Sequence, residues 1–145
     1  MAETDTTVTK QDAIKAVTRW FDEIWSTGDL QAVDEVLDPN LDFILSFNRT
    51  HGLDQFKRLL MANRNAFENL TYHGDEIVVD GNTAAAYWTM HTTKHRATWN
   101  NVEPSGNPVS IHGMSFFHFA NGKIVDIKVI SDLYGMMSQI GGIKQ

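Results

Sequence analysis

The C-terminal stretch from Phe116 to Gly142, FFHFANGKIVDIKVISDLYGMMSQIGG, constrains the fold more than any other part of the chain. β-branched and aromatic residues on both sides of Ala120–Gly122 predict a hairpin, because the glycine is free to adopt a positive φ in the turn. Asp132 is expected to cap a final helix over 133–140. A two-stranded hairpin is only marginally stable in water, so the preceding chain must supply further strands and a helical cover.

The first half of the chain has helical periodicity. Apolar spacing predicts a first helix over Thr9–Thr27, capped by its first residue, and a second over Leu30–Leu37, which Pro39 prevents from continuing. A strand is expected over Leu41–Phe47, and a third helix after Gly52. The apolar face of that third helix consists of Leu53, Phe56, Leu59, Leu60 and Phe67.

From Leu70 onward the apolar period changes to two, which predicts strands over about 70–79, 83–97, 108–119 and 123–131. Helices followed by consecutive antiparallel strands are typical of the α+β class. The strands carry bulky apolar residues on both faces, and helices cover only one of them. We therefore expect a homodimer, in which a second subunit covers the other face.

Composition sets wider limits. The chain has 145 residues, 42% of them hydrophobic, which predicts one globular domain over 1–145. The net charge of −6 argues against a nucleic-acid partner, and the lack of cysteine excludes disulfides and thiolate metal sites. No apolar run is long enough to cross a membrane, and the polar N-terminal segment lacks a signal core. A cytoplasmic location is expected.

Four segments, in this order and spacing, carry a resemblance to a known family. They are WFDEIWSTGDLQAVDEVLDPN, GLDQFKRLL, AAAYWTMHTT and FFHFANGKIVDIKVISDLYGMMSQIG. The chain resembles the SnoaL-like polyketide cyclases of the nuclear transport factor 2-like superfamily. The resemblance implies a cone-shaped fold, in which a curved, mostly antiparallel sheet packs on N-terminal helices around one apolar cavity. The superfamily holds both enzymes and binding proteins, so function has to be argued from the residues that face the cavity.

The resemblance bears directly on catalysis. In the cyclases of this family an aspartate on the last strand is the acid/base group, and the corresponding residue here is Val129, which cannot transfer a proton. Asp132, three residues later, matches a second aspartate of the family, but the role of helix N-cap is favoured for it. Asp132 and His112 are the candidate catalytic residues.

The register of the last hairpin decides whether His112 faces the cavity, because a slip of one residue inverts every side chain. A three-residue loop with a glycine bulge turns one set inward: Gly113, Ser115, Phe117, Val125, Ile127 and Val129. A two-residue loop turns the other set of the first strand inward: His112, Met114, Phe116 and His118. The resemblance favours the bulge, with the histidines on the outer face and Ser115 as the one polar group of these strands in the wall.

No metal or cofactor is expected. The chain has six histidines, and only His91 and His95 have a spacing that pairs ligands on a helix. Both lie on a predicted strand, where four residues separate them by roughly 13 Å. No glycine-rich phosphate loop is present.

The candidate substrate-binding residues are apolar except for one serine: Trp25, Phe43, Trp88, Met90, Ser115, Phe117, Ile127 and Val129. They indicate a hydrophobic, ring-containing small molecule as partner. Two functions stay open. One is a cyclase, isomerase or dehydratase that transfers a proton without a cofactor in a dry pocket. The other is a small-molecule-binding protein without catalysis.

Overall fold

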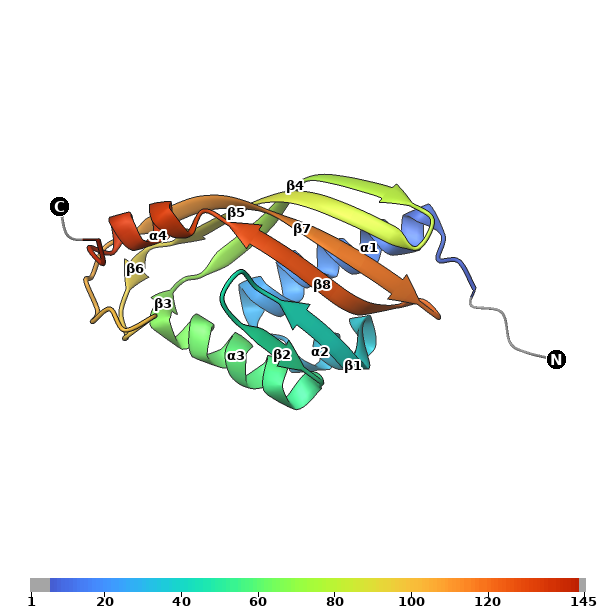
Figure 1. The fold of residues 1–145 in the computed structure, drawn as a ribbon, viewed down its shortest axis with the longest axis horizontal. Coiled ribbons are helices and arrows are strands. Elements are labelled where there is room, and N and C mark those ends of the chain that lie inside the picture. The colour runs from blue at the N-terminus through green and yellow to red at the C-terminus, as the bar shows by residue number, and fades with distance from the viewer. Residues whose placement is uncertain (1–5, 144–145) are drawn as a thin grey trace.

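A computed structural model describes residues 6–143 and shows an α+β fold in which a curved sheet arches over helices (Figure 1). The helical segments are α1 (Lys10–Arg19), η1 (Trp20–Trp25), α2 (Leu30–Val36), α3 (Leu53–Ala66) and α4 (Leu133–Gln139). The strands are β1 (Leu37–Ile44), β2 (Arg49–His51), β3 (Phe67–Glu68), β4 (Thr71–Asp80), β5 (Thr83–Thr92), β6 (Lys94–His95), β7 (Val109–Ala120) and β8 (Lys123–Ser131). The predicted helices and all five predicted strands are present, with β1 in place of the strand expected over Leu41–Phe47.

The main sheet of residues 6–143 has six strands in the order β2-β1-β8-β7-β5-β4, and β3 and β6 form a separate pair. All neighbours are antiparallel except β1 and β8, which run parallel. Alternation along β5 and β7 buries one face against the helices, as the period of two predicts. That inner face and the helices together enclose the core.

Some predicted boundaries were wrong. The second helix ends at Val36, because Pro39 disfavours helical backbone in the residue before it. The chain continues directly into β1, which begins four residues earlier than the predicted strand. Phe67 belongs to β3 and not to the third helix. The long strand predicted over 83–97 ends at Thr92, followed by the short strand β6.

The first helix is interrupted by a π-helical segment, η1, that alters the direction of its aromatic side chains. In an α-helix of 3.6 residues per turn, two residues five apart point in different directions. A π-helix forms i→i+5 bonds, so residues five apart lie above one another. Trp20 and Trp25 are five apart, and their rings lie edge to face with centroids 5.8 Å apart. The extra residue thus turns both indoles to the same side.

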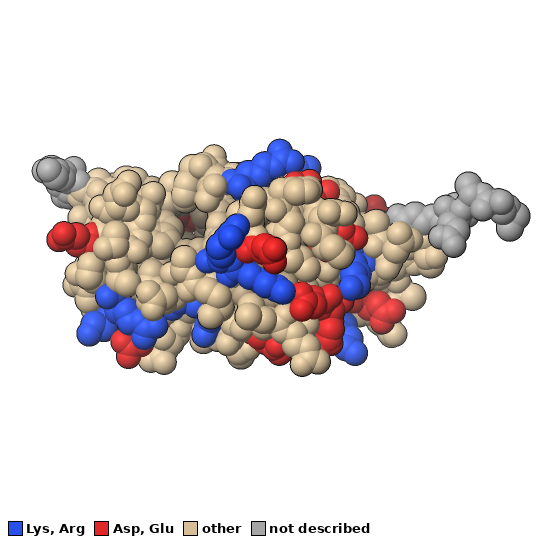
Figure 2. Space-filling model, turned by 90° about the horizontal axis from the view of Figure 1, so that it is seen from below, with Lys and Arg blue, Asp and Glu red and all other residues tan. Residues whose placement is uncertain are grey.

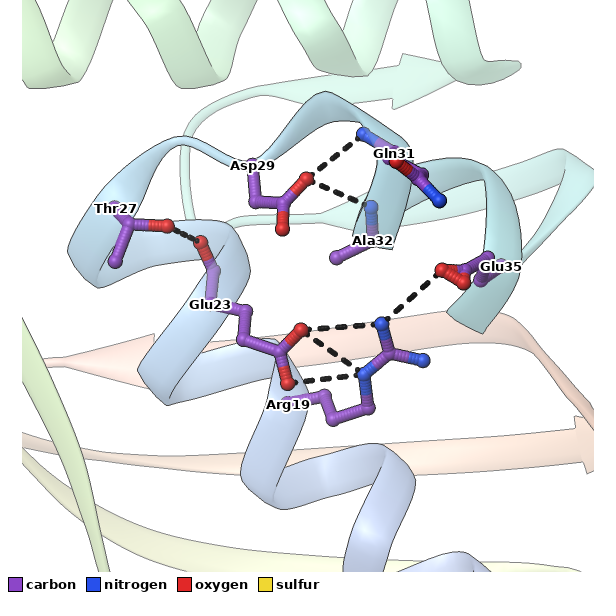
Figure 3. Close-up of polar contacts among 7 residues, drawn as sticks. All are labelled: Arg19, Glu23, Thr27, Asp29, Gln31, Ala32 and Glu35. Carbon is purple, nitrogen blue, oxygen red and sulfur yellow. Dashed lines mark hydrogen bonds and ion pairs between the residues drawn. The ribbon is translucent and has the colours of Figure 1, made fainter.

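A charged cluster joins this helix to α2 (Figure 3). The guanidinium of Arg19 donates to both carboxylate oxygens of Glu23 at 3.0 and 3.1 Å, and to Glu35 of α2 at 3.3 Å. Asp29 caps α2 by accepting hydrogen bonds from the backbone N–H groups of Gln31 and Ala32. These contacts hold η1 and α2 together on the outer side of the helical layer.

The final hairpin differs from both loop models considered above. Its loop has two residues, Asn121 and Gly122, with φ of 51° and 80°, as a type I′ turn requires. A bulge in β8 then shifts the register: His118 lies opposite Asp126, while the next residue, Phe119, lies opposite Ile124. The loop has only two residues, yet Ser115 faces inward, because the bulge in the strand shifts the register by one residue.

Candidate functional site

A pocket lies between the inner face of the sheet and the helices. Its cavity volume is about 90 Å³. One water molecule needs roughly 10–15 Å³ of such volume, so the pocket has room for several. The lining residues are mostly apolar: Trp20, Phe21, Trp25, Phe43, Leu45, Ser46, Phe47, Leu59, Asn63, Phe67, Leu70, Tyr72, Trp88, Met90, Trp99, Ile111, Ser115, Val129, Ser131, Leu133 and Met136.

All four tryptophans of the chain line this pocket. Trp20 and Trp25 come from η1, Trp88 from β5 and Trp99 from the segment after β6. Trp88 lies over the backbone of Gly113, where any Cβ would overlap the indole ring. The closest approach of strand and ring therefore requires glycine at this position.

Trp99 is held in place by α3. Its indole N–H donates to Asn63 Oδ1 at 2.7 Å, and the amide of Asn63 donates to the carbonyl oxygen of Leu59 at 2.9 Å. Both hydrogen-bonding ends of Asn63 are thereby used within the protein. The segment that carries Trp99 is fixed against the helix as one wall of the pocket.

On the opposite wall, Ser115 is 3% exposed and its Oγ accepts a hydrogen bond from Trp88 Nε1 at 2.9 Å. A hydroxyl group has one proton to donate besides the lone pairs that accept. Within residues 6–143 the Ser115 hydroxyl donates to no acceptor. Its proton is free for a group inside the pocket.

Tyr72, a partly buried residue, supplies another hydroxyl to the pocket. It lies on β4 opposite Met90, which places it on the inner face, and its ring contacts Trp25 and Trp88 at centroid distances of 5.1 and 5.3 Å. Its hydroxyl makes no hydrogen bond within residues 6–143. Burial raises the pKa of Tyr72 far above its ordinary value, because the phenolate would lose its hydration. The phenol therefore stays protonated and retains a proton that it can donate.

The lining contains no charged side chain and no histidine among the residues that the structure describes. The molecular surface seen from below is hollowed in the left half of the view, among mostly uncharged residues (Figure 2). Lysine and arginine are interspersed with aspartate and glutamate over the rest of that face. The wall of the pocket therefore consists of apolar and aromatic side chains with a few neutral polar groups.

Six of the eight residues expected in the wall do line the pocket: Trp25, Phe43, Trp88, Met90, Ser115 and Val129. The other two, Phe117 and Ile127, are fully buried opposite each other on β7 and β8 and belong to the core beside the pocket. Sequence reasoning missed Tyr72, although extending the alternation from Leu70 along the predicted strand reaches it. It also missed Asn63 and Trp99, and the irregular segment of Trp99 has no periodicity that would reveal it.

The two candidate catalytic residues lie outside the pocket wall. Asp132 is exposed and caps α4, its carboxylate accepting a hydrogen bond from the Gly135 N–H at 2.8 Å, as the capping prediction requires. His112 is exposed on the outer face, where it stacks on Tyr87 with ring centroids 5.4 Å apart. The register that would turn His112 inward is not the one observed.

Two further features are absent from the described part of the chain. Nowhere in residues 6–143 do three or more potential metal ligands of the histidine, cysteine, aspartate or glutamate type come together. None of the helices in that range is long and apolar enough to span a bilayer.

Comparison with known proteins agrees with this architecture. The family model for the SnoaL-like polyketide cyclases matches residues 15–140, so the chain belongs to that family, and its fold is of the nuclear transport factor 2-like type. No curated protein matches the sequence.

Three solved structures illustrate the similarity. A candidate SnoaL-like polyketide cyclase from Jannaschia sp. CCS1 superimposes with a TM-score of 0.85 at 21% identity, covering 98% of this chain and 100% of its own. TsrD from Streptomyces laurentii has a TM-score of 0.86 at 18% identity, with coverages of 94% and 99%. IdmH from Streptomyces antibioticus, a candidate polyketide cyclase, has a TM-score of 0.74 at 21% identity, with coverages of 90% and 99%. At these identities the likeness shows a shared fold.

Proposed function

We propose that this SnoaL-like protein takes a hydrophobic, ring-containing small molecule into the pocket between its sheet and its helices. The observation that carries the proposal is the gathering of all four tryptophans around one unfilled space. Flat aromatic surfaces bury large areas at a low cost in conformational entropy and stack on rings of a ligand. A pocket of this composition suits an uncharged aromatic or alicyclic molecule better than a sugar or a nucleotide.

The residues that line the pocket favour a protein that binds a small molecule without catalysing a reaction. Proton transfer needs a titratable group within hydrogen-bond reach of the reacting atom. Val129 occupies the place where the family's cyclases have their acid/base aspartate, and it lines the pocket as an inert side chain. The raised pKa of Tyr72 suits a donor and not a base.

Cofactor-independent proton transfer is the second candidate, and one observation favours it. Asp132 stands between Ser131 and Leu133, both of which line the pocket, so its backbone is at the wall although its carboxylate caps α4. Membership of the cyclase family supports this candidate as well. The substitutions of Asp132 described in the Discussion separate the two functions.

Titration with the neutral fluorescent probe N-phenyl-1-naphthylamine tests the proposal. We expect its emission to rise on binding with one site per chain. Val129→Trp should fill the pocket and weaken binding at least tenfold. The matched control is Ile130→Trp, because Ile130 is the next residue of β8 and its side chain is 69% exposed on the outer face. This variant should bind as the wild type does.

The two variants also separate the two apolar surfaces of the molecule. A probe that binds to the exposed outer face instead would respond to Ile130→Trp and not to Val129→Trp. That result, or full binding by a folded Val129→Trp protein, would contradict the proposal.

A further inference from the structure

A second, polar depression opens at the end of α3, and two arginines line it. It has a volume of about 520 Å³ and shares Phe67 and Leu70 with the wall of the apolar pocket. The rest of its lining is polar: Ser26, Arg64, Glu68, Asn69, Thr71 and Arg96. We call it the arginine depression. Neither of its arginines lines the apolar pocket.

Backbone carbonyl oxygens hold both guanidinium groups in place. Arg64 Nη1 donates to the carbonyl oxygen of Trp25 at 2.6 Å, and Arg96 Nε donates to that of Asn65 at 2.9 Å. Gly28 leaves room for the first guanidinium, because a Cβ at this position would lie 2.7 Å from Arg64 Nε. Each guanidinium has five N–H groups, so most donors of both side chains remain unused within residues 6–143.

No paired carboxylate balances the positive charge of the arginine depression. Neither Arg64 nor Arg96 forms an ion pair within residues 6–143, although the carboxylate of Glu68 belongs to the same lining. Both arginines lie at the C-terminal end of α3, where the helix dipole supplies only about half a negative charge. Burial, and then the nearby charge of Arg96, lower the pKa of Arg64 below its ordinary value, because both disfavour the cation. An anion in the depression would relieve this repulsion.

We propose that the arginine depression binds a phosphate group, either free or at the end of an organic molecule. A phosphate group carries close to two negative charges and at least three acceptor oxygens, so it can accept from two guanidinium groups at once. A carboxylate has only two oxygens, which a single guanidinium fork can occupy. Asn69, Thr71 and Arg96 are exposed, so the depression is open to solvent and the phosphate can stay attached to a larger molecule.

Titration with inorganic phosphate and with phenyl phosphate tests the proposal, with binding followed by the broadening of the phosphorus NMR line. Ionic strength is kept constant with sodium chloride, because salt screens the attraction between exposed charges. The wild type should bind both ligands with one site per chain. Acetate, added as a competitor, should bind at least about tenfold more weakly than phosphate, because it cannot accept from both guanidinium groups.

Arg96→Gln is the principal variant, because Arg96 is exposed and its substitution leaves the core intact. It should weaken the binding of both phosphates about tenfold or more, the effect expected for hydrogen bonds to a charged group. The matched control is Arg58→Gln, which removes the same charge from an exposed position of α3 outside the depression and should bind as the wild type does. Arg64→Lys keeps the charge and loses the planar fork, so it should weaken binding about threefold or more.

Each contrary outcome overturns a definite statement. Absence of phosphate binding by the wild type overturns the site, and so does an equal loss in Arg58→Gln and Arg96→Gln, which would indicate attraction by net charge alone. Acetate that binds as tightly as phosphate overturns the choice of phosphate. Binding of inorganic phosphate without phenyl phosphate overturns the organic ligand and leaves the free ion.

The apolar pocket supplies the last control. Val129→Trp, which fills that pocket, should bind both phosphates as the wild type does. A loss of phosphate binding in Val129→Trp would place the phosphate in the apolar pocket and overturn the second site. Failure of the proposed function, measured with the neutral fluorescent probe, leaves this result unaffected.

Discussion

At the scale of single residues, Asp132 and Gly135 form a unit at the start of α4. The Asp132 carboxylate accepts the Gly135 N–H at 2.8 Å, and a Cβ at position 135 would overlap that carboxylate. The glycine therefore allows the side chain of the cap to fold back over the first turn. This arrangement satisfies a backbone donor that has no partner within the helix.

Two substitutions of Asp132 distinguish a cap from an acid/base group. Asn keeps an acceptor in the capping position and should lower the free energy of unfolding by well under about 1 kcal/mol, whereas Ala should lower it by about 1 kcal/mol. If Asp132 is only a cap, Asp132→Asn should be fully active in any turnover assay. A stable but inactive Asp132→Asn protein would instead assign proton transfer to this carboxylate. Chemical denaturation and turnover are measured on the same samples.

Which strand residues face the pocket could be predicted where a residue type combined with strand alternation. Trp88 and Met90 are two residues apart on β5 and therefore face the same side of the sheet. Ser115 lies on the buried face of β7, as the alternation along that strand requires. Trp25 was expected in the wall, but Trp20 lies there as well because of a π-helical segment, and one extra residue per turn is too small a change to detect in a periodic pattern. Trp99 reaches the wall through a hydrogen bond to another element, which a linear sequence does not encode locally.

At the scale of elements, the last hairpin shows why register is hard to predict. The turn residues were identified correctly, but the loop is one residue shorter than favoured, and a bulge in β8 compensates for it. Ile124 is fully buried opposite Phe119, while Val125, the residue left over by the bulge, was expected on the inner face and is only partly buried. Packing of β8 between two other strands decides the place of the bulge, and this depends on contacts distant in sequence.

A further prediction concerns Gly122, the glycine of this turn. Gly122 has a φ of 80° and nothing near it that a Cβ would meet, so a substitution there changes backbone strain alone. Gly122→Ala should lower the free energy of unfolding by about 1–2 kcal/mol, because the left-handed region is unfavourable for alanine. Gly122→Asn should cost less, since asparagine tolerates this region. Urea denaturation measures both, and equal losses would show that strain in the turn is not the cause.

At the scale of the whole molecule, the outer face of the sheet carries exposed apolar side chains in two adjacent rows. Tyr87, Met114 and Ile130 lie side by side across β5, β7 and β8, and Phe116 lies in the next row. Their exposed fractions range from 38% to 69%. Exposed apolar side chains in adjacent rows are characteristic of a surface that a partner covers.

We predict that this face joins two copies of the chain. Sedimentation at micromolar concentration should give twice the chain mass of 16.4 kDa. Met114→Lys should produce a monomer, because it places a charge in the middle of the apolar row. Met61→Lys is the matched control, since Met61 is 47% exposed on α3, compared with 57% for Met114. A monomeric wild type, or a dimeric Met114→Lys protein, would contradict the prediction.

The architecture could be predicted from sequence more completely than the site. Helical periodicity followed by a period of two was sufficient for the α+β class and for the long strands, since burial of one face of each element determines both patterns. The parallel pairing of β1 with β8 left no such trace, because the two strands are separated by most of the chain. The pocket depends on this pairing, since Phe43 of β1 and Val129 of β8 both belong to its wall.

The central place of β8 has a consequence for the order of folding during synthesis. β8 is the last strand of residues 6–143, yet it lies between β1 and β7 and connects the two parts of the sheet. Pairings between residues far apart in sequence form slowly, because closing a long loop costs entropy first. A nascent chain that stops before Lys123 has β1–β2 and β4–β5–β7 as separate pieces. The six-stranded sheet can therefore close only after β8 has been made.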